Sequence, residues 1–159
     1  MATGDAILSF DGTATTVLAQ TATLVTANYS TSSTFTVSEF DNSTDLWPMA
    51  VATLLLPETF SAAPTVNSSI DLYICERDVG GGTTDVTVPT ATLQKGAKYI
   101  GSFRPLYATD EDQPLTVTFS LAGVRKATFA IYNGSGASLS YSAGGNSVKV
   151  EGFTVTPSA

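Results

Sequence analysis

The most informative absences in this sequence are histidine, paired cysteines and concentrated charge. There is no His and only one Cys among 159 residues. Histidine is the commonest metal ligand and the usual proton carrier near neutral pH, so its absence removes His-assisted nucleophilic catalysis and the usual zinc sites. A lone Cys75 cannot form an internal disulfide, and in a strand we expect it to be inert filler. We therefore expect a protein that is not an enzyme and that uses no metal or cofactor.

Charged residues are also few, at 13% of the chain, and they leave a net charge of −7. The seven Lys and Arg residues are scattered along the sequence. Because binding to a phosphate backbone requires clustered cations, we expect no nucleic-acid partner. No apolar run approaches the roughly 18 residues of a membrane span, and the N-terminal residues lack the basic start and long apolar core of a secretory signal. The sequence thus predicts neither a membrane partner nor a signal peptide.

Three local patterns suggest a reactive or modified site, and each has a simpler interpretation. The acidic run at 110–112 lacks the spacing of a calcium loop and indicates a solvated loop tip. The glycine-rich segment at 80–85 lacks the Gly-Lys-Ser/Thr ending of a phosphate loop and indicates a hairpin tip. A chain this rich in Ser and Thr forms Asn-x-Ser/Thr triplets by chance, so we expect no glycosylation. The triplets begin at Asn28, Asn42, Asn67 and Asn133.

Hydrophobic residues recur with a period of two along most of the chain, which is typical of strands. Residues 49–56 are apolar on both faces, which predicts a central strand, whereas residues 115–121 alternate as a half-buried strand does. Shorter alternating segments predict further strands at 35–37, 70–75, 99–103, 127–131, 139–141, 148–150 and 153–155. Gly and Asn residues between these segments favour turns. We expect an all-β fold, a single antiparallel β-sandwich or jelly-roll-like domain of about eight to ten strands.

The N-terminal region is less regular. Residues 15–25 fit a short helix, because Leu18, Ala22 and Val25 would share one face, but they also fit a strand. The many Thr residues favour the strand, since a branched Cβ suits a pleated sheet.

This irregularity suggests two parts to the chain. We assign residues 1–30 to an extended N-terminal segment or arm and residues 31–159 to the β-sandwich domain. Trp47, which precedes Pro48, is expected to anchor a loop against the core.

The order of strands and turns over residues 46–155 carries a family resemblance. A central strand leads through an Ala-Pro-Thr-x-Asn turn at 63–67 into an Asp-Leu-Tyr strand at 71–73. An Asn-x-Ser-Gly turn at 133–136 precedes the final hairpin. In these features the chain resembles small β-sandwich virion proteins of tailed bacteriophages. No catalytic residue accompanies the resemblance, and residues 1–45 lie outside it.

The resemblance implies a capsid decoration, or cement, protein that binds the outer capsid surface and stabilises contacts between capsomers. Its partners would be the major capsid protein and neighbouring copies of itself, with a homotrimer as one state the resemblance allows. It would be made in the host cytoplasm and located on the virion. An acidic protein suits the outside of a shell filled with DNA. A head-fibre, tail or adaptor component of the phage particle is the alternative within the virion.

Apolar residues in and near the N-terminal region are the candidate contacts with other subunits. They are Leu8, Phe10, Val17, Leu18, Leu24, Val25 and Trp47. If these residues form an arm, removal of residues 1–25 should abolish capsid binding and leave the sandwich folded.

Aromatic residues support a second alternative, a carbohydrate-binding β-sandwich module. Tyr and Trp side chains can form a platform on which sugar rings stack, although scattered Tyr in strands more often serves packing or an interface. The aromatic residues considered are Tyr29, Trp47, Tyr73, Tyr99, Tyr107, Tyr132 and Tyr141.

Overall fold

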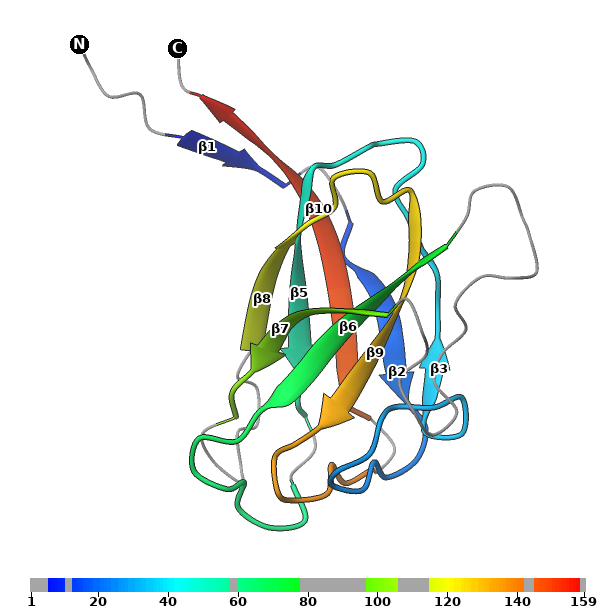
Figure 1. The fold of residues 1–159 in the computed structure, drawn as a ribbon, viewed down its shortest axis with the longest axis vertical. Helices are drawn as coiled ribbons and strands as arrows, with labels where there is room; N and C mark the ends of the chain where they lie inside the picture. The colour runs from blue at the N-terminus through cyan, green and yellow to red at the C-terminus, as the bar shows by residue number, and fades with distance from the viewer. Residues whose placement is uncertain are drawn as a thin grey trace.

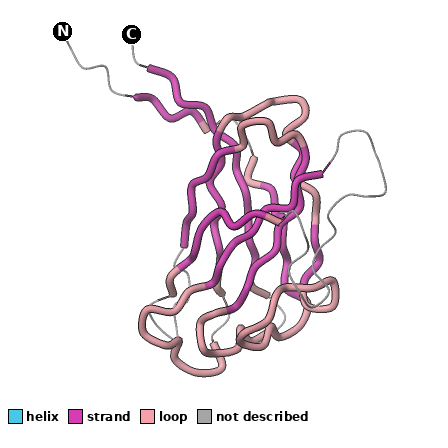
Figure 2. Tube along the Cα trace, in the orientation of Figure 1, coloured by secondary structure: helices cyan, strands magenta, loops and turns pink. Residues whose placement is uncertain are grey.

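The regular structure of the protein is entirely β over the part of the chain that the computed structural model describes, residues 6–10, 13–57, 60–77, 97–105, 115–141 and 145–157 (Figures 1 and 2). The strands there are β1 (Ala6–Ser9), β2 (Thr15–Gln20), β3 (Phe35–Val37), β4 (Phe40–Asp41), β5 (Met49–Leu55), β6 (Ile70–Arg77), β7 (Lys98–Phe103), β8 (Leu115–Ser120), β9 (Lys126–Asn133) and β10 (Ser147–Pro157). Within these ranges no helix could cross a membrane.

The strands form two antiparallel sheets, which confirms the predicted β-sandwich. One sheet runs in the order β3-β2-β10-β5-β8, with β1 paired to the end of β10, and the other runs β4-β9-β6-β7. In Figure 1 the strands β6, β7 and β9 lie in front of β5, β8 and β10. As expected for a central strand, β5 has a neighbour on each side.

Alternate side chains from both sheets fill the space between them, as the period of two requires. The first sheet contributes Val17, Leu18, Phe35, Ala50, Ala52, Leu54, Val148 and Val150, and the second contributes Phe40, Ile70, Leu72, Ile74, Phe129 and Ile131. All of these side chains are buried. Burial of this apolar surface is the main force that holds the sheets together.

The expected N-terminal arm is divided between two positions. Residues 15–20 form β2, which lies inside the first sheet between β3 and β10, so for this part of residues 15–25 the strand prediction is confirmed over the helix. Further along, Leu24 is buried and forms a bridge with Leu139. Of the expected arm, β1 is the strand that lies off the main path of the sheet.

Two predicted strand boundaries differ from the structure. Residues 139–141 form no strand, because Leu139 instead makes single bridges to Leu24 and Phe60. Residues 148–150 and 153–155 belong to one continuous strand, β10. The glycine between them, Gly152, stays within the strand. An aromatic ring occupies the space beside this glycine.

That ring belongs to Trp47. A Cβ atom added to Gly152 would overlap atoms of the indole, so only glycine lets the ring lie against the strand. The indole also packs against the buried core and lies 6.1 Å from the ring of Phe40, measured between ring centroids. The expectation that Trp47 anchors a loop against the core is confirmed.

This contact predicts the effect of a single methyl group. Gly152→Ala should lower the free energy of unfolding by about 1–3 kcal/mol, because the new methyl overlaps the Trp47 ring. Chemical denaturation followed by circular dichroism measures the change. In a Trp47→Ala background the same substitution should be less destabilising, and an equal loss in both backgrounds would show that the ring is not the cause.

Candidate functional site

Beyond the core, the first surface feature is a ribbon made by the two terminal strands. In this terminal ribbon, defined as residues 6–10 and 153–157, Ala6 lies opposite Pro157 and Ser9 opposite Thr154. The ribbon extends away from the body of the sandwich (Figure 1). In the described part of the chain, no other strand pairs with β1. Isolated two-stranded ribbons are only marginally stable in water, so a contact with another surface would stabilise this one.

Apolar side chains at the base of the terminal ribbon are open to solvent. Phe10 is 52% exposed and Val155 is 47% exposed. The ring of Phe10 lies on the ring of Phe153, with 5.2 Å between their centroids. The terminal ribbon therefore combines a strand edge that no other described strand covers with exposed hydrophobic surface, two features that favour binding of a partner.

The structure separates the seven candidate contact residues into two groups. Val17, Leu18 and Leu24 are buried in the core and are unavailable to a partner in this fold. Val17 and Leu18 lie in β2, an inner strand of the sheet, and Leu24 forms a bridge with Leu139. Of the others, Phe10 and Val25 are exposed and Trp47 is partly buried near the base of the terminal ribbon. Leu8 pairs with Val155 along the backbone of β1.

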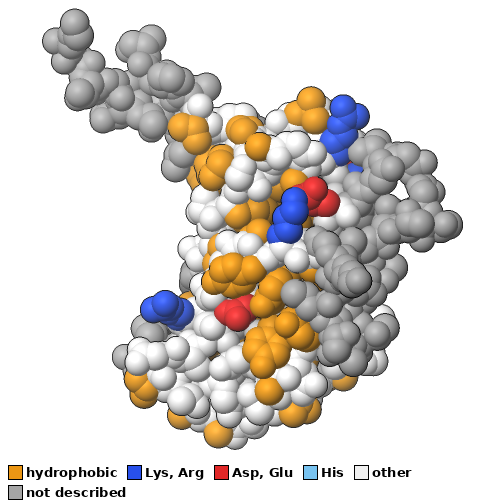
Figure 3. All heavy atoms as spheres, in the orientation of Figure 1, with side chains coloured by type: hydrophobic (Ala, Val, Ile, Leu, Met, Phe, Trp, Pro, Cys, Tyr) orange, Lys and Arg blue, Asp and Glu red, His pale blue; other side chains and the backbone are white. Residues whose placement is uncertain are grey.

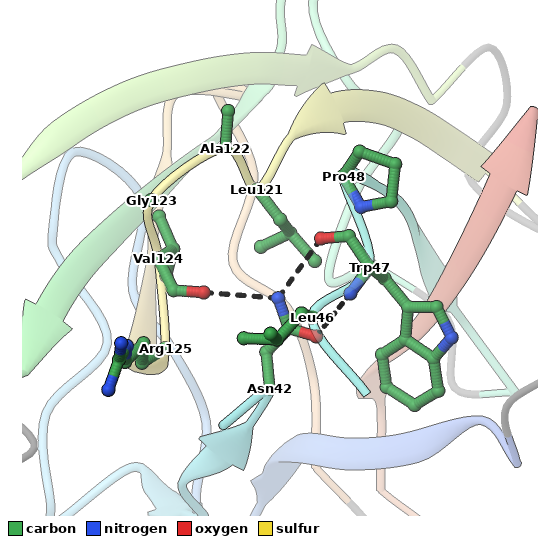
Figure 4. Close-up of a pocket in the computed structure, with 9 residues that line it drawn as sticks. All are labelled: Asn42, Leu46, Trp47, Pro48, Leu121, Ala122, Gly123, Val124 and Arg125. Atoms are coloured by element: carbon green, nitrogen blue, oxygen red, sulfur yellow. Dashed lines mark hydrogen bonds between the residues drawn. The ribbon is translucent and has the colours of Figure 1, made fainter. Parts of the chain in front are cut away.

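A second feature is a hollow of about 320 Å³ beside Trp47 (Figure 4). Its centre is occupied by the side chain of Asn42, which is 1% exposed. The Asn42 Nδ2 donates to the carbonyl oxygens of Trp47 and Val124, both at 3.0 Å, and its Oδ1 accepts from the Trp47 N–H at 2.8 Å. Because these bonds use the polar groups at the centre, the hollow is better explained as loop structure than as a ligand site.

Burial also decides whether two of the four Asn-x-Ser/Thr triplets can be glycosylated. Asn133 is fully buried, and its Nδ2 donates to the carbonyl oxygens of Leu24 and Ala137 at 3.1 and 2.9 Å. In the folded protein, neither Asn42 nor Asn133 presents its amide nitrogen for glycosylation. Both side chains instead link distant loops to the sheet.

The third feature lies on the outer side of the β4-β9-β6-β7 sheet. We define the tyrosine face by Tyr29, Tyr73, Tyr99 and Tyr132 together with Asp71 and Ser102. Figure 3 views the molecule from this side, and hydrophobic side chains gather there next to acidic ones. The sequence alone could list these aromatic residues, but only the pairing of strands brings four of them together.

The tyrosine rings form a continuous chain of contacts. Tyr29 lies 4.8 Å from Tyr132 and 5.8 Å from Tyr73, and Tyr73 lies 5.8 Å from Tyr99, all between ring centroids. The arrangements are tilted or edge-on, which are favourable geometries for aromatic pairs. Tyr99 is the most open of the four, at 58% exposed, and the other three are half-buried.

Asp71 provides the polar centre of the tyrosine face. Its Oδ1 accepts hydrogen bonds from the hydroxyls of Ser69, at 2.8 Å, and Ser102, at 2.7 Å. The Ser102 hydroxyl is also 2.7 Å from that of Tyr99. Burial of its hydroxyl, and then the neighbouring Tyr29, raise the pKa of Tyr73 to about 12. The Tyr73 hydroxyl therefore remains protonated at physiological pH.

Tyr29 also lines a hollow of about 290 Å³ next to the tyrosine face. Its walls carry the side chains of Asn28, Thr31 and Ser33, and exposed Val25 contributes an apolar part. This volume is at the small end of the range for ligand pockets.

The remaining candidate reactive groups contribute little to the described surface. In the described ranges no three His, Cys, Asp or Glu side chains come together as a metal site would require. Cys75 is buried, and burial raises the pKa of its thiol, which keeps the sulfur in its unreactive protonated form. The acidic run at 110–112, the glycine-rich segment at 80–85 and Tyr107 lie outside the described residues.

Comparison of the chain with models of known protein families and with curated proteins gives no match.

The Asn42 network predicts a loss of stability on substitution. Asn42→Ala should lower the free energy of unfolding by about 1–3 kcal/mol, because a backbone N–H and two carbonyls lose their buried partner. Thermal and chemical denaturation measure the change. The matched control is Asn28→Ala, which removes an exposed side chain with one bond to the Thr26 carbonyl and should change stability by less than about 0.5 kcal/mol. Equal effects would contradict the assigned role.

Proposed function

We propose that this chain is a non-enzymatic virion structural protein, a capsid decoration protein that binds the outer surface of a capsid and stabilises contacts between capsomers. The resemblance over residues 46–155 supports this proposal, as does a net charge of −7, which suits the outside of a DNA-filled shell. The partners would be the major capsid protein and other copies of this chain.

The terminal ribbon is the observation that carries the proposal. A decoration protein needs an adhesive surface and no reaction chemistry, and the ribbon is such a surface. Phe10 and Val155 would enter an apolar hollow on the neighbouring subunit, where burial of each side chain favours binding. The outer edge of β1 would add to a strand of the partner through backbone hydrogen bonds.

The position of β2 changes the design of a deletion test. Removal of residues 1–25 would take away β2, an inner strand whose Val17 and Leu18 side chains are fully buried. Such a variant should fail to fold, so it cannot separate docking from folding. Point substitutions in the terminal ribbon leave the sandwich intact and test docking alone.

The test compares capsid binding by a variant with two substitutions in the terminal ribbon with capsid binding by a variant substituted elsewhere. The double variant Phe10→Ser, Val155→Ser should bind about 10- to 100-fold more weakly to capsid shells of the parent virus that were assembled without this protein. Its thermal unfolding should stay close to that of the unchanged chain. Co-sedimentation with the shells measures the affinity.

The matched control is Val66→Ser, which changes an 86% exposed apolar side chain in the connection between β5 and β6, at the end of the sandwich opposite the ribbon (Figure 1). This variant should bind the shells as the unchanged chain does. Failure of the unchanged chain to bind would reject the decoration role. A few copies confined to one vertex or to the tail, rather than many over the shell, would favour the head-fibre, tail or adaptor alternative.

A further inference from the structure

We propose that the tyrosine face is a binding site for neutral saccharides. A sugar ring would stack on the exposed aromatic surface around Tyr73 and Tyr99, and its hydroxyls would bond to the Asp71 carboxylate and the hydroxyl of Ser102. This inference is independent of the decoration role, because it rests on a different surface. The terminal ribbon extends from one end of the sandwich, whereas the tyrosine face lies on its side (Figures 1 and 3).

The first support is a β-bulge that places the polar and aromatic groups together. Leu72 pairs with Gly101, but the next residue, Tyr73, pairs with Tyr99, so Ile100 is an extra residue in β7. Residues three apart on a regular strand point to opposite faces, yet the bulge brings the Tyr99 and Ser102 hydroxyls within 2.7 Å. Bulges that redirect side chains in this way are common next to functional sites.

The second support is the shape of the aromatic surface. Neighbouring rings are 4.8–5.8 Å apart between centroids, so they touch each other. There is no room between touching rings for a cation, which argues against a cage for a quaternary ammonium group. The exposed ring of Tyr99, which lies edge-on to Tyr73, instead offers apolar surface on which the C–H face of a pyranose can lie.

The third support is the hydrogen-bonding chemistry beside the platform. A sugar hydroxyl both donates and accepts, and here it meets a carboxylate and the Ser102 and Tyr99 hydroxyls, whose hydrogens go to Asp71 and Ser102 and whose oxygens can accept. The Oδ2 atom of Asp71 has no hydrogen-bond partner in the described structure, because both bonds from Ser69 and Ser102 go to Oδ1. That oxygen can accept a hydrogen bond from a ligand hydroxyl.

Charge selects the class of saccharide. Asp71 lies within the tyrosine face, and Glu76 is the next acidic residue along β6, where it pairs with Lys98 at 2.6 Å. A sulfated or sialylated glycan would therefore meet a carboxylate and a chain of net charge −7. A neutral sugar meets no such repulsion.

A proline-rich peptide is the other ligand that binds to tyrosine platforms. Its prolines have no N–H group, so such a peptide has few donors to offer the carboxylate of Asp71. Binding it would bury a charged acceptor without a partner, which is unfavourable. The donor-rich rim of a sugar fits Asp71 better.

The experiment uses the full chain on an array of neutral, sialylated and sulfated oligosaccharides, with titration calorimetry on the best ligand. Trp47 fluorescence is a poor reporter, because that ring packs on Gly152 in the other sheet. The unchanged chain should bind neutral oligosaccharides in preference to acidic ones. Tyr99→Ala and Asp71→Asn should each weaken binding about tenfold or more.

The matched control is Tyr141→Ala, which removes a 42% exposed tyrosine that belongs to no ring contact of the tyrosine face. It should bind as the unchanged chain does, and all variants should show native circular dichroism. The proposal is overturned if no neutral glycan binds, if acidic glycans bind better, if a proline-rich peptide binds in their place, or if Tyr141→Ala loses as much affinity as Tyr99→Ala.

Discussion

The hydrogen-bond ladder along β10 is the constraint on which the rest of this structure depends. From Ser147 to Val150 the strand pairs with β2 on one side and β5 on the other, and the β5 pairing continues to Phe153. From Thr154 onward the same strand pairs with β1. One unbroken strand therefore runs from the centre of a sheet into the terminal ribbon, and Gly152 allows it to pass the Trp47 ring at the junction. The direction of the ribbon is set by the core.

The fold could be read from the sequence because alternation is a local signal, but the roles of individual apolar residues could not. Val17 and Leu18 look the same in sequence whether they face a core or a partner, and only the place of β2 between β3 and β10 decides it. The tyrosine face could also not be predicted from the sequence. It depends on the non-local order β9-β6-β7, on a bridge between Tyr29 and Tyr132, and on a bulge that shifts Tyr99. The sequence did give one signal of this face: the alternation of apolar and polar residues, which places Asp71 and Tyr73 on the side of the strand opposite its buried side.

Polar side chains have two different uses in this protein. Asn42 and Asn133 are buried and donate hydrogen bonds to backbone carbonyls far away in the sequence, so they link distant segments of the chain. Asp71 and Ser102 instead lie beside exposed aromatic rings, where their groups can meet a ligand. Together with the terminal ribbon, this division gives the sandwich one end and one separate side face that we propose as binding surfaces. A protein on a capsid could then hold its neighbours and still present a binding surface outward.

Electron cryomicroscopy of the virus particle that we propose carries this chain tests this account most directly. The account predicts many copies over the shell, each with residues 6–10 and 153–157 covered by a neighbouring subunit and with the tyrosine face turned to the solvent. A map in which the terminal ribbon projects into solvent while another face of the sandwich contacts the capsid would contradict it.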